Sequence, residues 1–267
     1  MDSHHTRRRA LGRLLSGLAL GGAWLLPAQA QDRVLVVGTG STFRPFGFVT
    51  PDRKIVGFDI DVMNAIAAQQ GMKLRYESTP FSAIFPALEN GDRDIVVAAV
   101  TNTAARRERA DFSNPYMVAQ LSVLLGPGVS AASLNELRSR RVGVALNSTA
   151  DTAVSEAFGK TASNVRRFEN TPLMLEELNQ GGVDAAVGDV SVLSFYQRNN
   201  PEKRFRLLAD ARFPQAYLGI VVKKGNKPLL DRINAGLRQV IDSGEYARIH
   251  LKWFGTAAPP LPASIPG

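Results

Sequence analysis

Cysteine is absent from the 267-residue chain, and histidine is almost absent. Without cysteine the protein folds without disulfides, even in an oxidising compartment, and it offers no thiol for lipid attachment. Two of the three histidines, His4 and His5, lie in the first thirty residues, which leaves only His250. We therefore expect no Ser/His or Cys/His catalytic site, no histidine-based metal site and no cofactor.

Concentrated positive charge is also lacking. The formal net charge of +8 falls to +5 when the four arginines and one aspartate of residues 1–30 are set aside, because 28 basic and 23 acidic residues remain. The basic residues are dispersed apart from the short run Arg138–Arg141, and aromatic residues do not alternate with them. This pattern does not favour a nucleic acid as a partner.

Long hydrophobic runs are missing beyond the N-terminus. There, a basic segment, Thr6–Arg9, precedes a short apolar segment, Leu14–Leu26, and the small residues Ala28–Ala30 follow. This order predicts a signal peptide, residues 1–30, that is cleaved after Ala30. Sec export is favoured over the twin-arginine route, and no later segment is long and apolar enough to span a membrane.

The sequence does contain an alternation of strand and helix patterns. An apolar run at 33–38 predicts a strand, and a helix pattern follows with Asp59 as its N-cap. The loop between them carries Phe43 and Phe46, two aromatic residues that we expect to be exposed. Similar strands and helices continue to residue 253, which predicts an α/β fold with parallel sheets.

The stretch Asp94–Ser113 combines a strand pattern with charged and polar groups. Its apolar run Ile95–Val100 predicts a buried strand, and the polar residues Thr101–Thr103 are suited to cap a following helical turn. That turn carries Arg106, so hydroxyls, backbone N–H groups and a guanidinium meet at the carboxyl end of a strand. These groups suit a carboxylate ligand. The alternative is a surface turn with solvated arginines.

One spacing pattern occurs twice in the chain. Leu, Gly, Asp and Val recur at three-residue intervals from Leu88 to Val97 and again from Leu178 to Val187. In this register Asp189 corresponds to Ala99, and Ser191 corresponds to Thr101. The repeat suggests two similar lobes that present their strand ends to one cleft, although such spacing also arises by chance in α/β chains.

Opposite charges at two facing strand ends suit a zwitterion. Arg106 would hold a carboxylate through its planar guanidinium, and Asp189 would hold an ammonium group. Thr101, Thr149 and the backbone N–H groups of the helix after Ser148 would complete the carboxylate site. Asp189 and Thr149 are equally suited to act only as helix caps.

Two phenylalanines follow strands near this site. Phe43 and Phe81 each lie in a loop just after a strand, where they would pack on the body of a ligand. Their positions alone favour ordinary core packing instead.

Several motifs in this order resemble one family. The chain is similar to the extracytoplasmic solute-binding proteins of polar amino-acid ABC transporters, the family of the glutamine- and histidine-binding proteins. The resemblance covers about Arg33 to Gly255. The motifs that carry it are Phe43–Phe48, Val56–Asp61, Phe81–Leu88, Thr101–Arg106, Asp111–Ser113 and Gly244–Gly255.

The resemblance implies a two-lobed α/β fold of the type II periplasmic-binding-protein class, with two hinge strands and a ligand cleft between the lobes. Lobe 1 would comprise residues 32–117 plus 218–255, and lobe 2 residues 118–217. The second crossing would fall near Pro214–Leu218. Apart from the resemblance, the proline-rich composition of the tail, residues 256–267, predicts disorder. A periplasmic monomer that serves an ABC-transporter permease is the expected form.

The resemblance also implies roles for site residues. Arg106 would anchor the carboxylate beside Thr101 and the Ala99 carbonyl, and Asp189 would bind the ammonium. Phe43 and Phe81 would sandwich the ligand side chain, which replaces core packing as our expectation. The ligand loop of lobe 2 would contain Leu146, Thr149 and Ala150.

The residues expected to select the ligand side chain are mostly small or apolar. Gly40 stands where related glutamine and basic-residue binders carry an acid, Gly188 leaves space before Asp189, and Leu146 is apolar. A cationic side chain would lack a counter-charge there, so we expect a neutral one. An acidic ligand would need a second cation such as Arg44. The alternative function is an enzyme resembling cyclohexadienyl dehydratases, which needs a general acid that we do not identify.

Overall fold

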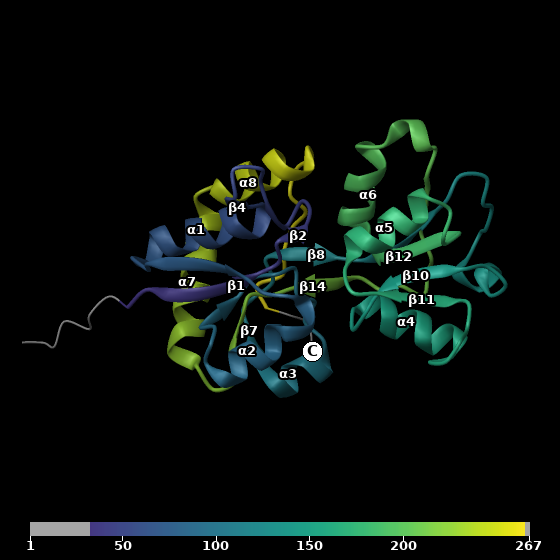
Figure 1. Cartoon of the computed structure of the whole chain (residues 1–267). Coiled ribbons are helices and arrows are strands. Elements are labelled where there is room, and N and C mark those ends of the chain that lie inside the picture. The colour runs from purple at the N-terminus through teal and green to yellow at the C-terminus, as the bar shows by residue number, and fades with distance from the viewer. Residues whose placement is uncertain (1–32, 265–267) are drawn as a thin grey trace, which may run out of the picture. The chain divides into compact units, whose positions relative to one another are not determined.

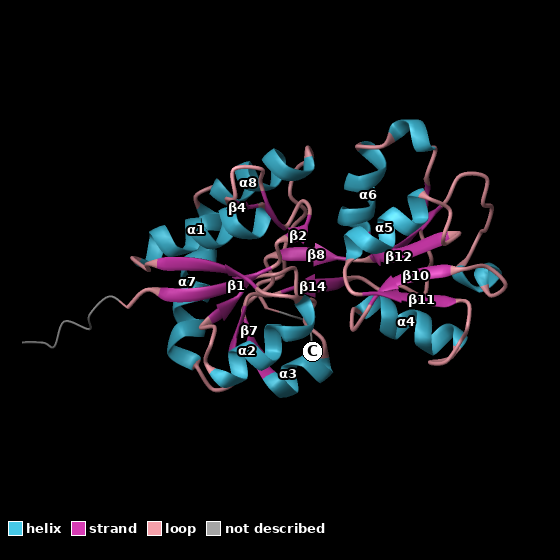
Figure 2. Ribbon diagram, in the orientation of Figure 1, coloured by secondary structure: helices cyan, strands magenta, loops and turns pink. Residues whose placement is uncertain are grey.

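The computed structural model describes residues 33–264. The predicted signal peptide, residues 1–30, and its cleavage after Ala30 lie outside the described residues and stay predictions. Strands and helices alternate along the described chain, as Figure 2 shows. Within residues 33–264 the strands are β1 Leu35–Thr39, β2 Thr42–Phe43, β3 Gly47–Val49, β4 Ile55–Val56, β5 Leu74–Ser78, β6 Ile95–Val96, β7 Ala110–Phe112, β8 Met117–Ala119, β9 Leu121–Leu125, β10 Val142–Ala145, β11 Val165–Phe168, β12 Ala185–Asp189, β13 Arg206–Leu208, β14 Ala216–Leu218 and β15 Val221–Lys223. The α-helices are α1 Phe58–Gln70, α2 Ile84–Asn90, α3 Ala104–Arg109, α4 Thr149–Phe158, α5 Thr171–Asn179, α6 Val190–Arg198, α7 Lys227–Asp242 and α8 Glu245–Phe254, and short 3₁₀ turns lie at Phe81–Ala83, Leu134–Leu137 and Pro201–Lys203.

The strands form two five-stranded sheets of similar design. The first has the order β5-β1-β6-β15-β7 and the second the order β11-β10-β12-β9-β13. The prediction of parallel sheets is wrong for β15 and β9, which run antiparallel to their neighbours. Each of these two strands follows a strand that links the sheets, whereas a parallel neighbour requires a crossover connection.

Two short strands carry the chain between the sheets (Figure 1). β8 leads from the first sheet into β9, and β14 leads back into β15. They pair antiparallel, with Met117 opposite Leu218 and Ala119 opposite Ala216. The resemblance implied two crossing strands, and β8 and β14 are two. β14 lies within the segment where the second crossing was expected.

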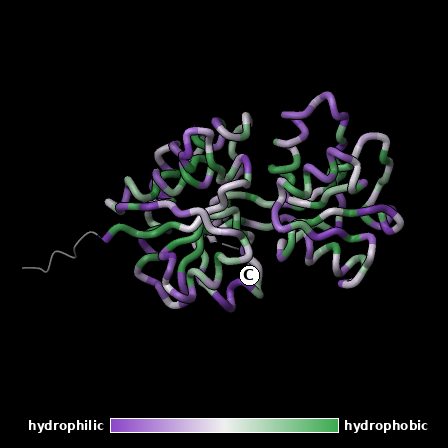
Figure 3. Tube along the Cα trace, in the orientation of Figure 1, coloured by the Kyte–Doolittle hydropathy of each residue, from purple (hydrophilic) through white to green (hydrophobic). Residues whose placement is uncertain are grey.

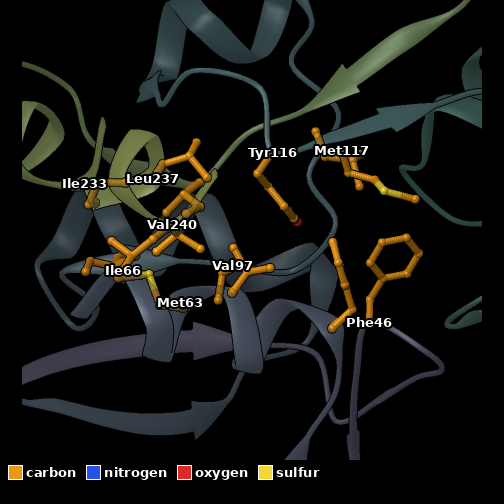
Figure 4. Packing of buried hydrophobic residues seen from close by; sticks show 14 of the residues in the cluster. Phe46, Met63, Ile66, Val97, Tyr116, Met117, Ile233, Leu237 and Val240 are labelled. Atoms are coloured by element: carbon orange, nitrogen blue, oxygen red, sulfur yellow. The ribbon is translucent and has the colours of Figure 1, made fainter. Parts of the chain in front are cut away.

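Each sheet has its own buried apolar cluster, and the hydropathy colours of Figure 3 follow the strands of both. In the cluster of the first sheet, Met63 and Ile66 of α1 pack with Ile233, Leu237 and Val240 of α7 (Figure 4). The strands that join the sheets are part of the first cluster, since Met117 and Ala119 of β8 and Leu218 of β14 belong to it.

Helices α1 and α7 approach each other closely at Gly236. This glycine is buried within α7, and a Cβ atom placed on it would lie 2.9 Å from Ile66 Cγ2 and 2.9 Å from Gln70 Cγ. Carbon atoms in a close-packed interior do not come so near without displacing a neighbour. Glycine is therefore the residue that this helix contact admits.

The loop after β1 does not expose both of its aromatic residues. Phe43 is half-buried, but Phe46 is 1% exposed and meets Phe58 edge-to-face with ring centroids 6.0 Å apart. The expectation was therefore wrong for Phe46. Strands β2, β3 and β4 form a small antiparallel sheet that turns this ring into the core.

The apolar run Ile95–Val100 is buried, as predicted, except for the half-buried Ala99, but it is a strand only at Ile95–Val96. Further along, Ala99 adopts a φ of +48°, in the left-handed region that few non-glycine residues occupy. The chain leaves the sheet at this point. An apolar run in the sequence therefore predicts that its residues are buried. It does not predict that all of them pair in a sheet.

The repeated Leu-Gly-Asp-Val spacing corresponds to a repeated contact. In the first sheet Asp94 Oδ2 accepts from Val36 N at 2.8 Å, and its other oxygen pairs with Arg33. In the second sheet Asp184 Oδ2 accepts from Arg141 N at 2.8 Å, and the same arginine side chain pairs with it. Each aspartate thus fixes the start of the neighbouring parallel strand.

The Pro-rich tail, expected to be disordered over residues 256–267, is described as far as residue 264. Ala258 and Leu261 pack against the core cluster of the first sheet. Burying these apolar side chains opposes the disorder that the proline content suggested.

Candidate functional site

A cavity of about 740 Å³ lies at the carboxyl ends of parallel strands from both sheets. Residues after β1, β5 and β6 line it from the first sheet, and residues after β10, β11 and β12 line it from the second. Helix α5 of the second sheet also contacts β2 beside this cavity. The place agrees with the general location of ligands in open α/β sheets.

All eleven residues expected at a ligand site line this cavity. From the first sheet come Gly40, Phe43, Phe81, Ala99, Thr101 and Arg106, and from the second Leu146, Thr149, Ala150, Gly188 and Asp189.

Arg106 presents an uncompensated positive charge to the cavity. Its Nη1 donates to the Thr101 carbonyl at 3.0 Å and its Nη2 to the Asn147 carbonyl at 3.5 Å. Both acceptors are neutral, and within residues 33–264 no carboxylate pairs with this guanidinium. Burial lowers the pKa of Arg106 to about 10, so the side chain is still protonated at pH 7.

The loop before Arg106 is fixed by backbone contacts. Thr101 forms an isolated antiparallel bridge with Leu218, and Asn102 N donates to the Tyr217 carbonyl at 2.8 Å. Thr103 caps α3, since its side chain accepts from Arg106 N. The predicted capping segment is therefore confirmed, and it holds the Arg106 backbone beside β14.

The first turn of α4 supplies unpaired backbone donors. Ser148, not Thr149, is the N-cap, because its side chain accepts from Asp151 N at 3.1 Å. Among the described residues the N–H groups of Thr149 and Ala150 have no hydrogen-bond partner. Such groups at a helix N-terminus favour an anion.

Asp189 is a helix cap that also lies at the cavity. It caps α6, with Oδ1 accepting from Ser191 N at 2.8 Å, and it also lines the cavity. Burial raises the pKa of Asp189 to about 6, although hydrogen bonds from Ser191 oppose this shift. At pH 7 the group is a carboxylate with acceptor capacity beyond the cap.

Phe43 and Phe81 combine core packing with exposure to the cavity. Phe43 stacks on Phe46 with ring centroids 5.7 Å apart, and the Arg106 guanidinium carbon lies 5.2 Å from the Phe81 ring centroid. Both rings are half-buried. The two alternatives for these residues are therefore compatible.

Two other arginines near these residues, Arg44 and Arg107, do not line the cavity. The Arg44 guanidinium carbon sits 3.7 Å from the Phe48 ring centroid, and Arg44 does not line the cavity. Arg107 donates to Asn102 Oδ1 and faces a smaller pocket. Arg44 therefore does not provide the second cation that an acidic ligand would need.

Two carboxylates at the cavity were not identified from the sequence. Glu156 on α4 and Glu169 just after β11 line the cavity, and both are exposed. In the described part of the chain, neither forms a hydrogen bond or ion pair with another residue. The position of Glu169 directly after a strand was the signal that could have revealed it.

A third missed residue is Asp59. The predicted N-cap role is wrong, because Gly57 occupies that position. Asp59 is fully buried and accepts hydrogen bonds from Ala99 N and from the Tyr116 hydroxyl, both at 2.8 Å. The pattern of a helix start suggested a cap, and nothing local indicated contacts 40 and 57 residues away.

Residues 33–264 contain neither a metal-binding cluster nor a membrane-spanning helix. No group of three or more His, Cys, Asp or Glu side chains there could hold a metal ion. No helix in the same part of the chain is both long and apolar enough to cross a membrane.

Comparisons with known proteins agree with this fold. A probable histidine-binding protein from Neisseria gonorrhoeae is 37% identical over 229 residues, which cover 85% of each chain. The crystal structure of the arginine-, lysine-, histidine-binding protein ArtJ from Geobacillus stearothermophilus superposes with a TM-score of 0.81 at 32% identity, over 84% of this chain and 96% of ArtJ. An ancestral arginine-binding protein bound to glutamine gives a TM-score of 0.77 at 38% identity, over 84% and 98%.

These likenesses confirm the two-lobed type II periplasmic-binding-protein fold that the resemblance implied. The relatives are named as binding proteins, and the family model for bacterial extracellular solute-binding proteins, family 3, matches residues 35–256. The chain therefore belongs to the bacterial extracellular solute-binding proteins of family 3, and it is a binding protein, not an enzyme.

Proposed function

We propose that the chain binds one L-amino acid in the cavity between its two sheets. The observation that carries this proposal is the pair of opposite charges at the cavity, Arg106 from the first sheet and Asp189 from the second. Arg106, Thr101 and the free N–H groups at the start of α4 hold the carboxylate. Asp189 and the Ala99 carbonyl hold the ammonium.

The ligand side chain lies between Phe43 and Phe81, and it is uncharged at neutral pH. Gly40, Gly188 and Leu146 line the cavity without adding charge. Glu156 and Glu169 are exposed, so water screens their attraction for a cation deeper in the cavity. Histidine and glutamine satisfy these conditions, and the names of related binding proteins include both.

The protein acts in transport. Its signal peptide is removed after Ala30, and the mature monomer binds its amino acid in the periplasm and delivers it to an ABC-transporter permease. The named relatives include an ABC transporter glutamine-binding protein of Bacillus subtilis, 31% identical over 86% of this chain and 84% of that protein.

Ligand binding closes the cleft by a hinge motion. Lobe 1 comprises residues 32–117 plus 218–255, and lobe 2 residues 118–217, so that the hinge falls at β8 and β14. A ligand that contacts Arg106 and Asp189 together stabilises the closed arrangement, since only there can it reach both lobes.

A panel of the twenty L-amino acids tests the proposal by thermal unfolding and calorimetry. A ligand at 100 times its Kd adds about 2.7 kcal/mol to the free energy of unfolding, which raises Tm by roughly 5–11 °C for a chain of this length. We expect shifts with histidine or glutamine and smaller ones with lysine or glutamate. A panel without any shift would overturn amino-acid binding, and a preference for lysine or arginine would overturn the neutral side chain.

A further inference from the structure

Asp59 is a buried carboxylate that does not line the cavity. It lies in the first turn of α1 and is 0% exposed. Its Oδ2 accepts from Ala99 N at 2.8 Å, and its Oδ1 accepts from the Tyr116 hydroxyl at 2.8 Å. Burial raises the pKa of Asp59 to about 7, and the two hydrogen bonds oppose that shift. A buried carboxylate is costly unless donors satisfy it, so these two contacts are its main support.

The first of these contacts holds an unusual backbone conformation. Ala99 has a φ of +48°, which costs an L-residue with a Cβ atom free energy unless its surroundings enforce it. Ala99 also lines the cavity. The Asp59 carboxylate fixes the N–H group of this residue, and thereby the direction of the peptide groups on either side.

The second contact reaches the first strand that links the sheets. Tyr116 immediately precedes β8, is fully buried and lies in the core of the first sheet (Figure 4). Its backbone N–H donates to the Leu218 carbonyl of β14 at 3.1 Å. Tyr116 is therefore bonded to β14 through its backbone and to Asp59 through its hydroxyl.

The cavity loop is bonded to the same strand. Gly219 N donates to the Val100 carbonyl at 3.1 Å, and Asn102 N donates to the Tyr217 carbonyl at 2.8 Å. The loop of Ala99, the start of β8 and the end of β14 thus form one hydrogen-bonded group. Asp59 joins two of these segments, because one carboxylate oxygen accepts from Ala99 N and the other accepts from the Tyr116 hydroxyl.

We infer that Asp59 is a positioning residue that sets the binding loop at Ala99 and couples it to the linking strand at Tyr116. The inference rests on the proposed amino-acid site. Movement of β8 relative to α1 would be transmitted through this carboxylate to the peptide groups that face the ligand. Affinity and the open–closed equilibrium should therefore change together when the link is broken.

Three variants separate the two contacts. Tyr116→Phe removes only the bond to the linking strand, because Asp59 keeps Ala99 N. Asp59→Asn keeps an oxygen for Ala99 N but presents an amide to Tyr116, and Asp59→Ala removes both contacts. Asp61→Asn is the matched control, because Asp61 lies two residues away on α1 and, within residues 33–264, its side chain accepts hydrogen bonds only from Lys252 and Trp253.

Affinity is measured by calorimetry with L-histidine, L-glutamine and L-arginine as separate probes. Tyr116→Phe and Asp59→Asn should each weaken binding by about tenfold, as loss of one hydrogen bond to a charged group allows. Asp59→Ala should weaken it by roughly 100-fold, and Asp61→Asn should not alter it by more than about threefold. The double variant Asp59→Asn with Tyr116→Phe should weaken binding by less than the product of the two single effects, because both changes alter the same hydrogen bond.

A purely structural role would lower stability without this pattern. Chemical denaturation therefore accompanies each measurement, and small-angle scattering reports whether the probe still reduces the radius of gyration. Tyr116→Phe should reduce that compaction at probe concentrations that saturate the wild type. If Asp59→Ala does not fold, Tyr116→Phe and the double variant still decide the outcome.

Two negative results have different meanings. If the wild type binds a probe and the folded Asp59 and Tyr116 variants bind it equally well, the positioning role is wrong and the amino-acid site stands. If the wild type binds none of the three probes or any other amino acid, the proposed function is wrong and the positioning role falls with it.

Discussion

The guanidinium of Arg106 lies at the cavity beside hydroxyl and backbone N–H donors. It donates to two backbone carbonyls, and within residues 33–264 no carboxylate compensates its charge. We expect Arg106→Ala to weaken binding of the preferred amino acid by roughly 100-fold or more, because losing one partner of a desolvated charge pair costs about 2–5 kcal/mol. Calorimetry measures the change. Arg107→Ala is the control, since Arg107 lies outside the cavity, and near-normal affinity of Arg106→Ala would assign the anchor elsewhere.

The carboxylate of Asp189 should make binding sensitive to pH. Burial raises the pKa of Asp189 to about 6, so the group is charged above that pH and neutral below it. An ammonium favours the charged form. Affinity is therefore full near pH 7 and lost as the pH falls through 6, by up to about tenfold per pH unit.

L-Glutamine is a suitable probe for this pH profile, because its side chain does not titrate. In Asp189→Asn we expect weak binding at every pH and no step near pH 6. A step that persists in this variant would assign the titration to another group, of which Asp59 is the first candidate.

Gly40 bears on ligand selection. A Cβ atom at this position would lie 3.6 Å from Phe43 Cβ and 3.9 Å from the Gly47 carbonyl oxygen, so the site admits a side chain. Gly40→Asp should raise the affinity for L-arginine relative to L-glutamine by about tenfold, through a new charge pair. Competition binding measures the ratio, and Gly40→Asn gives the same bulk without the charge. An equal gain in Gly40→Asn would contradict the electrostatic explanation.

At this scale the sequence predicted the residues that follow buried strands, because the carboxyl ends of parallel strands meet at one edge. Arg106, Thr101 and Asp189 were found in this way. Asp59 was misread, because its partners come from distant segments. Glu156 lies on the third turn of a helix, where sequence alone does not distinguish a residue that lines a cavity from a solvated one.

The close packing of α1 on α7 predicts the effect of a substitution at Gly236. We expect Gly236→Ala to lower the free energy of unfolding by about 1–2 kcal/mol, because overpacking outweighs the helix propensity that alanine gains. Denaturant unfolding measures the change. Arg238→Ala, on the exposed face of the same helix, should stay within about 0.5 kcal/mol of the wild type. A stabilised Gly236→Ala would show that the helices separate at little cost.

Most elements were predictable because apolar periodicity and glycine stops mark where they begin and end. The direction of β9 and β15 was not, since it depends on which strand precedes each one. The small sheet of β2, β3 and β4 was also missed, because its strands are two or three residues long and leave no periodic signal.

Within residues 33–264, β8 and β14 join the two five-stranded sheets. We expect a bound amino acid to reduce the radius of gyration in small-angle scattering, because a ligand held by Arg106 and Asp189 favours the closed arrangement. The same amino acid added to Arg106→Ala should leave the radius unchanged. If the amino acid still reduced the radius of gyration of Arg106→Ala, closure would not depend on binding of the ligand carboxylate by Arg106.

Contact between α5 and β2 can be used to follow the opening, because α5 packs on β10, β11 and β12 of the second five-stranded sheet whereas β2 follows β1 of the first. Thr42 on β2 and Leu173 on α5 are both exposed, and the chain has no cysteine of its own. The pair Thr42→Cys and Leu173→Cys would therefore give two unique attachment points for paramagnetic labels. Pulsed electron paramagnetic resonance would then convert the opening beside the cavity into a distance distribution for each amino acid.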